Sequence, residues 1–453
     1  MRRRVVALVA SVLGLSILMF VVGAVAGGTP SEQPASVAGR PVGAQPAGQP
    51  LVGADVAANI ASLQTRLKSV PQDWSAWASL GGLYTTQARL TADPSYYGKA
   101  DGAFARSLEI QPQENTAALT GQATLASSRH DFAGALALTE KAEQFNAYNA
   151  LNLGVKVDAL VELGRYPEAF ATLQRMVDLK PGVASLSRVS YSYELRGDTA
   201  GAKDALDRTL EVAVSPADKA FALQYLGELA FNGGDLDTAE RQFTEGLRQV
   251  PDYMPLLAGR ARVEAARGQT EQAVKDWQLV TTRLPQPTYL IEYADLLTSL
   301  GRGQEAATQY ALVDATAALF RAQGANVDLE LSLFDADRGR PAEALTAAKA
   351  QIDLRQSTAV EDAYAWALHV SGRDAEALVH AKAADHLGMK SALFAYHRGV
   401  IEQSLGNKGE AISWLQRSLE INPYFGDAPR RAVGPPLLAP KAKAALAALQ
   451  SGS

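Results

Sequence analysis

Small residues recur along the chain at nearly constant intervals. Eight glycines each precede an alanine by five residues: Gly164, Gly197, Gly234, Gly268, Gly301, Gly339, Gly372 and Gly406. The full set of recurrent alanines lies at intervals of 33 to 38 residues: Ala100, Ala135, Ala169, Ala202, Ala239, Ala273, Ala306, Ala344, Ala377 and Ala411. Glycine adopts the left-handed conformation at a helix end at low cost, and alanine lets a second helix approach closely. Each interval therefore predicts a hairpin of two α-helices, and the chain is expected to be all-α.

Larger apolar residues and prolines support the same unit. One leucine per first helix supplies an apolar plug in five units: Leu153, Leu186, Leu223, Leu257 and Leu290. Four prolines are predicted to end second helices: Pro181, Pro251, Pro285 and Pro423. Ahead of the first unit, apolar residues at helical spacing end at Pro71 and predict a capping helix, and 441–450 predicts a short closing helix.

The first unit carries a longer pattern. Its residues read W-x2-L-G-x2-Y and are then followed by Ala, Phe and Pro: Trp77, Leu80, Gly81, Tyr84, Ala100, Phe104 and Pro112. This pattern resembles the tetratricopeptide repeat (TPR) family, and the resemblance covers residues 52–424. It implies an α-solenoid, a right-handed superhelix of about ten TPR hairpins. Most later units have leucine in place of the tryptophan, which leaves unit boundaries near 115–147 and 325–357 open.

Three places depart from the regular period. The first unit has seven extra residues, including 93–97, which either lengthen the hairpin or form a protruding loop. Stretched joints between units are expected at 320–328 and near Ser215. Such breaks are tolerated in solenoids because each repeat contacts only its neighbours.

The N-terminal segment differs from the repeats. Three arginines at positions 2–4 precede an uncharged stretch of 22 residues, 5–26, which as a helix is long enough to cross a bilayer. We expect residues 1–26 to be an uncleaved membrane anchor, with a cleaved signal peptide as the alternative. Because positive charge stays inside, the repeats are expected on the extracytoplasmic side. Residues 27–51 are rich in Pro, Gly and Ala and predict a tether, and 425–453 a Pro-rich tail.

Composition narrows the range of functions. The formal net charge of −5 argues against nucleic acid as a partner. The chain has no cysteine, which removes thiol nucleophiles and zinc–thiolate sites. No nucleophile elbow, zinc-protease or nucleotide-binding motif is present, so the chain is not expected to be an enzyme or to carry a cofactor.

Histidines offer one candidate chemistry. Four of the five are close together in sequence, at His369, His380, His386 and His397. His380 and His386 are six residues apart on one helix and point to different sides, which disfavours a metal site. His369 and His397 are expected on adjacent first helices, where they could converge.

The TPR resemblance also indicates a binding surface. In that family the first helices line a concave groove, and placing the recurrent alanine at position 20 turns positions 5, 9 and 12 toward it. The candidate partner-binding residues at these positions are Tyr191, Glu228, Phe231, Arg262, Asp295, Trp366, His369 and Tyr396. Trp366 and Tyr396 either anchor a ligand or pack against each other.

The sequence favours a membrane-tethered extracytoplasmic scaffold that binds a peptide or protein segment in its concave groove. The alternative is an accessory factor in metal uptake or metalloprotein maturation at the cell envelope. That alternative rests on the histidines and on the similarity of the first hairpin to cytochrome c maturation factors. A structural spacer in an envelope assembly is a third possibility.

Overall fold

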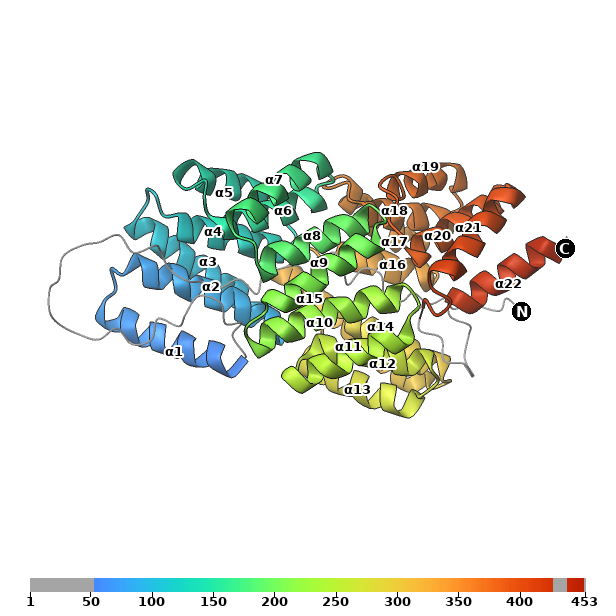
Figure 1. Ribbon diagram of the computed structural model, residues 1–453, viewed down its shortest axis with the longest axis horizontal. Coiled ribbons are helices and arrows are strands. Elements are labelled where there is room, and N and C mark those ends of the chain that lie inside the picture. The colour runs from blue at the N-terminus through green and yellow to red at the C-terminus, as the bar shows by residue number, and fades with distance from the viewer. Residues whose placement is uncertain (1–52, 427–437, 452–453) are drawn as a thin grey trace.

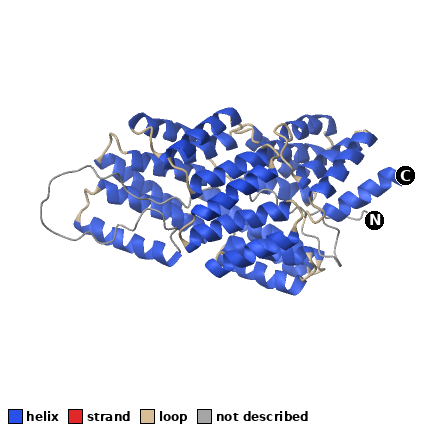
Figure 2. Ribbon diagram, in the orientation of Figure 1, coloured by secondary structure: helices blue, strands red, loops and turns tan. Residues whose placement is uncertain are grey.

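The computed structural model describes residues 53–426 and 438–451, so the predicted anchor and tether lie outside the described residues. The described chain contains 22 α-helices and no strand (Figures 1 and 2). One helix precedes the repeats and one follows them, namely α1 (Gly53–Ser69) and α22 (Leu438–Ser451). The ten first helices are α2 (Trp74–Thr91), α4 (Thr116–Ser128), α6 (Ala150–Glu162), α8 (Val183–Leu195), α10 (Pro216–Asn232), α12 (Met254–Ala266), α14 (Pro287–Ser299), α16 (Asp328–Asp337), α18 (Thr358–Val370) and α20 (Ala392–Ser404). The ten second helices are α3 (Ser95–Ile110), α5 (Phe132–Phe145), α7 (Tyr166–Leu179), α9 (Thr199–Val212), α11 (Leu236–Gln249), α13 (Thr270–Arg283), α15 (Gly303–Ala322), α17 (Pro341–Ile352), α19 (Asp374–Ala384) and α21 (Lys408–Ile421).

The ten hairpins confirm the period read from the small residues. Every recurrent alanine lies in a second helix and is at most 2% exposed. All eight glycines have φ between 68° and 78°, in the left-handed region. In the second hairpin His130 takes this conformation instead, with φ of 61°.

The irregular places are also located. The extra residues of the first unit lengthen its helices, since α2 runs to Thr91 and α3 begins at Ser95. The joint at 320–328 is a long α15 of 20 residues followed by an α16 of only 10. At the other joint, the Ser215 hydroxyl accepts a hydrogen bond from the Asp218 N–H and caps α10.

The helices wind into an elongated superhelix whose successive turns touch. In Figure 1 the helices α8 to α11 cross the view between the early helices α4 to α7 and the late helices α18 to α21. The turns inside hairpins two to five lie against the connections between later hairpins. The hydrogen bonds and the ion pair across this contact join residues 194, 193, 192 and 191 positions apart. We call this contact the seam; it comprises 129–131, 162–166, 196–198 and 231–235 against 323–327, 353–358, 385–391 and 422–425.

Polar groups join the two sides of the seam at its first two points of contact, which we call rungs. The Arg129 Nε donates to the Gln323 carbonyl oxygen at 2.9 Å, and the Asn326 N–H donates to the Arg129 carbonyl oxygen at 2.9 Å. At the second rung, Arg355 pairs with Glu162, and both side chains are under 5% exposed. These bonds replace water at backbone and charged groups that burial would otherwise leave unpaired.

Close backbone approach marks the remaining rungs. The Tyr166 hydroxyl accepts a hydrogen bond from the Thr358 N–H at 2.8 Å. A Cβ atom at Gly197 would overlap the Gly388 carbonyl oxygen, so glycine is required there for space as well as for its φ of 71°. The Asn422 Nδ2 donates to the Phe231 carbonyl oxygen at 2.9 Å.

No helix within 53–426 or 438–451 combines the length and the apolar character needed to cross a membrane. The membrane anchor predicted at 1–26 lies outside these ranges.

Candidate partner-binding groove

Charged side chains on neighbouring first helices bind each other along the concave side. Arg188 on α8 pairs with Asp158 on α6 through two hydrogen bonds of 2.8 and 2.6 Å. Arg262 on α12 pairs in the same bidentate way with Glu292 on α14, at 2.7 and 2.8 Å. Fork-to-fork pairing of this kind fixes geometry as well as charge, so these pairs set the register of adjacent repeats.

Asp295 sits in a similar arrangement at the next position. Its Oδ1 accepts hydrogen bonds from Arg338 at 2.7 Å and from the Tyr310 hydroxyl at 2.8 Å. Burial raises the pKa of Asp295 to about 7, although Arg338 opposes the shift. Asp337 lies close enough to add to it, and burial raises the pKa of Asp337 to about 6.

One pocket opens beside the predicted groove residue Tyr191. Its cavity volume is about 20 Å³, enough to hold a water molecule. Its polar lining comes from Asp158, Glu162, Arg188 and Ser192, and its apolar lining from α6, α7 and α8. Tyr191 itself is largely buried and belongs to the apolar cluster of these helices. The pocket therefore presents an ion pair and a tyrosine next to apolar walls.

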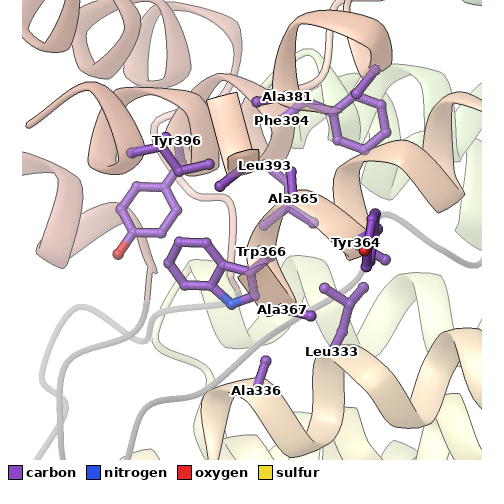
Figure 3. Close-up of a cluster of buried hydrophobic side chains, with 14 of the residues drawn as sticks. Leu333, Ala336, Tyr364, Ala365, Trp366, Ala367, Ala381, Leu393, Phe394 and Tyr396 are labelled. Carbon is purple, nitrogen blue, oxygen red and sulfur yellow. The ribbon is translucent and has the colours of Figure 1, made fainter. Parts of the chain in front are cut away.

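Trp366 and Tyr396 pack against each other, which settles the choice left open by the sequence. Their ring centroids are 6.1 Å apart, and both side chains are 6% exposed. Figure 3 shows them side by side within the apolar cluster of the late repeats, above Ala336 and Leu333. The Trp366 Nε1 donates to Asp337 at 2.9 Å, so this indole ties α18 to α16.

The histidines are distributed over separate carboxyl groups. His369 pairs with Asp374, His380 with Glu361 and His397 with Asp362. His369 and His397 each stack on the Trp366 ring, with centroids 4.9 and 4.1 Å from it. Among the described residues no three metal-ligating side chains are grouped closely enough to hold a metal ion.

The remaining predicted residues separate into two groups. Phe231 is buried in the apolar cluster of α10 to α14, because the last turn of α10 lies against the seam. Glu228 is only partly exposed and accepts a hydrogen bond from Gln224 at 2.9 Å. The structure thus brings Glu228 on α10 near Arg262 on α12 and places Phe231 in the interior.

Two carboxyl groups, those of Glu194 and Glu228, lie near each other. Burial, and then the Glu228 carboxyl, raise the pKa of Glu194 to about 8. Burial also raises the pKa of Glu228, with Arg262 opposing the shift. Glu194 lies on α8 and Glu228 on α10, so the pair bridges two successive first helices.

Several partners in this network escaped the groove prediction, including Arg188, Glu292 and Asp337. A signal for them exists in the sequence, because the paired residues on adjacent first helices are 30 positions apart in two cases and 29 in a third. A search for opposite charges about 30 positions apart would have indicated the ion pairs, whereas a search at fixed positions within each repeat did not.

The final hairpin carries the decisive sequence match. Residues 394–425, which span most of α20 and all of α21, match the family model for the tetratricopeptide repeat. The chain therefore contains a tetratricopeptide repeat at this hairpin. The matched unit has the same hairpin, buried alanine and left-handed glycine as the others, at Ala411 and Gly406.

Solved structures of TPR proteins resemble the chain at low identity. A tetratricopeptide repeat protein from Parabacteroides merdae is 16% identical, with 59% of this chain and 98% of that chain covered and a TM-score of 0.34. The Cut9–Hcn1 hetero-tetramer of the APC/C is 17% identical, with 86% and 81% covered and a TM-score of 0.37. YrrB, described as a TPR protein with an unusual peptide-binding site, is 20% identical, with 40% and 93% covered and a TM-score of 0.27. None of the curated protein sequences matches the chain.

Proposed function

We propose that this TPR protein is a scaffold that binds a peptide or protein segment along its concave side. The pocket beside Tyr191 carries the proposal, because it places the Asp158–Arg188 ion pair and apolar walls in one concavity. Polar groups that are fixed before the ligand arrives lose little entropy on binding, which favours affinity. That the chain is not an enzyme remains a prediction from the absence of catalytic motifs.

A photo-crosslinking residue in place of Tyr191 tests this function. We expect it to capture one defined peptide segment, identified by mass spectrometry and displaced by the synthetic version of that segment. The matched control carries the same residue at Val379, which is 64% exposed on a second helix. Equal capture from both positions, or capture that the synthetic segment does not displace, would contradict the proposal.

We further propose that residues 1–26 tether the scaffold to the cytoplasmic membrane, with the repeats on the extracytoplasmic side. The positive charge at positions 2–4 and the uncharged stretch after it support this orientation. Because the chain has no cysteine, a single cysteine at the exposed Ser451 gives a unique label site. A membrane-impermeant maleimide should label it in intact cells; labelling only after lysis would place the repeats inside.

A further inference from the structure

Three glutamates form a centre on the first helices at the middle of the array. They are Glu194 on α8, Glu228 on α10 and Glu292 on α14. Arg262 of α12 lies near Glu228 and is paired with Glu292. Among the described residues no ion pair joins a cation to Glu194.

Glu194 is the group that points to a ligand. Its residue is only 8% exposed, and no hydrogen bond or ion pair engages its carboxyl group within the described residues. A buried carboxyl group normally has a partner, because loss of hydration is otherwise uncompensated. In this position the nearest titratable neighbour is a second carboxyl group, Glu228, which makes the ionised form still less favourable without a cation.

Tyrosines surround the same centre. Tyr225 and Tyr289 are buried, and Tyr253 is half-buried at the start of α12. The Glu228 carboxyl raises the pKa of all three hydroxyl groups, after burial as the main cause, which places their polar ends around it. Arg188 lies near the Tyr225 hydroxyl and Arg89 near the Tyr253 hydroxyl, and each lowers the pKa of that group. Carboxyl groups framed by aromatic residues are a favourable environment for an ammonium or guanidinium ion.

The seam restricts how a ligand reaches this centre. Glu194 lies two residues before the Arg196–Asp198 turn, which is held against 385–391 of the next superhelical turn. A ligand that follows the inside of the superhelix would reach Glu194 without parting this contact. An extended peptide fits that path.

We propose that Glu194 and Glu228 together bind a lysine or arginine side chain of an extended basic peptide segment. This inference rests on the proposed function and names the class of partner that the groove accepts. The cation takes the place between α8 and α10 and pairs with both carboxyl groups, while the tyrosine hydroxyl groups complete its shell.

Calorimetric titration of the full-length chain tests the pair directly. We expect octalysine and octaarginine to bind and octaglutamate not to bind, with affinity falling as salt is added. Glu194→Gln with Glu228→Gln should weaken octalysine binding at least tenfold. Glutamine keeps the shape of the protonated side chain, so this variant is expected to fold.

A matched control removes two negative charges elsewhere. Glu168→Gln with Glu376→Gln changes two exposed residues that each pair with an arginine three positions away. We expect it to bind octalysine as the original chain does. An equal loss in both double variants would show unspecific attraction to a negative chain and overturn the site.

Proton release provides an independent readout. Near pH 7 the Glu194 carboxyl is largely protonated, since its pKa is about 8, and a bound cation lowers that pKa. Binding should therefore release up to about one proton, seen as a difference in heat between phosphate and Tris buffers, and Glu194→Gln should abolish it.

The outcomes separate this inference from the proposed function. If octalysine and octaarginine fail to bind while the Tyr191 crosslink captures a displaceable segment, the groove binds a partner but the basic class is wrong. If neither binds and no segment is captured, both proposals fail. Octaglutamate binding as tightly as octalysine also overturns the inference.

Discussion

The same hairpin turn exists in two environments in this molecule. Gly164, Gly197 and Gly234 lie at the seam, where atoms of the next superhelical turn stand within 3 Å of a Cβ placed on them. Gly339, Gly372 and Gly406 have the same positive φ, but nothing lies within 4 Å of such a Cβ. Identical local sequence signals therefore serve different purposes. At the open turns glycine satisfies the backbone alone, whereas at the seam it also admits a second layer of the protein.

The ion pairs differ in the same way. At the open turn Arg373 pairs with Glu376 on the surface, with both side chains over 40% exposed. At the seam Arg355 pairs with Glu162 in the interior, 193 positions away. Exposed pairs contribute little to stability, while breaking a buried pair leaves an uncompensated charge.

The largest expected effect comes from breaking the buried pair. Arg355→Met leaves the Glu162 carboxyl without its cation and should lower the free energy of unfolding by about 3–5 kcal/mol. Arg373→Met at the open turn should cost below about 0.5 kcal/mol. Urea denaturation followed by circular dichroism measures both, and equal midpoints for the two variants would show that the seam does not contribute to stability.

The second largest effect is expected from pH, because the carboxyl groups buried near the seam change the stability with pH. Burial raises the pKa of Glu162 to about 6 and that of the neighbouring Glu330 to about 7. The folded chain thus holds protons that the unfolded chain releases above pH 4.5. The stabilisation is complete below that pH and is lost as pH rises through 6 and 7. Between pH 4.5 and 7.5, Glu330→Gln should remove a decline of order 2–3 kcal/mol; an unchanged pH profile would contradict the burial of Glu330.

The two classes of glycine give the third test. Gly197→Ala must adopt a left-handed backbone and also displace the Gly388 carbonyl group, whereas Gly372→Ala meets the first difficulty only. We expect Gly197→Ala to cost about 2 kcal/mol more than Gly372→Ala in urea denaturation. Small-angle scattering should show a larger radius of gyration for Gly197→Ala alone, and expansion of both variants would argue against a special role of the seam.

The smallest effect is expected for a single hydrogen bond. Tyr166→Phe removes the acceptor of the Thr358 N–H and should cost about 1 kcal/mol. Hydrogen exchange should accelerate at Thr358 and much less at Ser371, whose N–H bonds within its own helix end. Uniform acceleration at both amides would indicate global loosening instead of opening at the seam.

Sequence alone predicted the helical hairpin that repeats in this fold, but not the contact between successive superhelical turns. Ala169 and Gly164 indicate a hairpin because helix packing and helix ending are local and repeat with the chain. The contact between Gly164 and Gln356 results from small rotations added over several repeats, and no residue pattern reports their sum. For the same reason the repeat position assigned Trp366 to the groove, whereas the side chain packs against Tyr396 between neighbouring helices.

The groove positions of Glu228 and Arg262 stay predictions from the repeat position. Both residues lie on first helices, but the bidentate bond between Arg262 and Glu292 depends on the stagger of two helices. Nothing in the sequence indicates that Glu194 has no cation paired with it. The absence of a paired cation depends on which carboxyl groups the neighbouring arginines already bind. Those pairings are known only from the three-dimensional structure.

The nearly constant offset across the seam, 191 to 194 positions for four of its bonds, has a consequence for how this chain can change in length. An ordinary solenoid gains or loses a repeat at little cost, because only the neighbouring units adjust. Here the deletion of any one hairpin between Gly164 and Gln356 would shift one side of the seam against the other. Every residue pair that forms a contact across the seam would then be mismatched at once. The number of repeats enclosed by one superhelical turn is therefore fixed by geometry, and evolution of this protein by duplication is confined to its two ends.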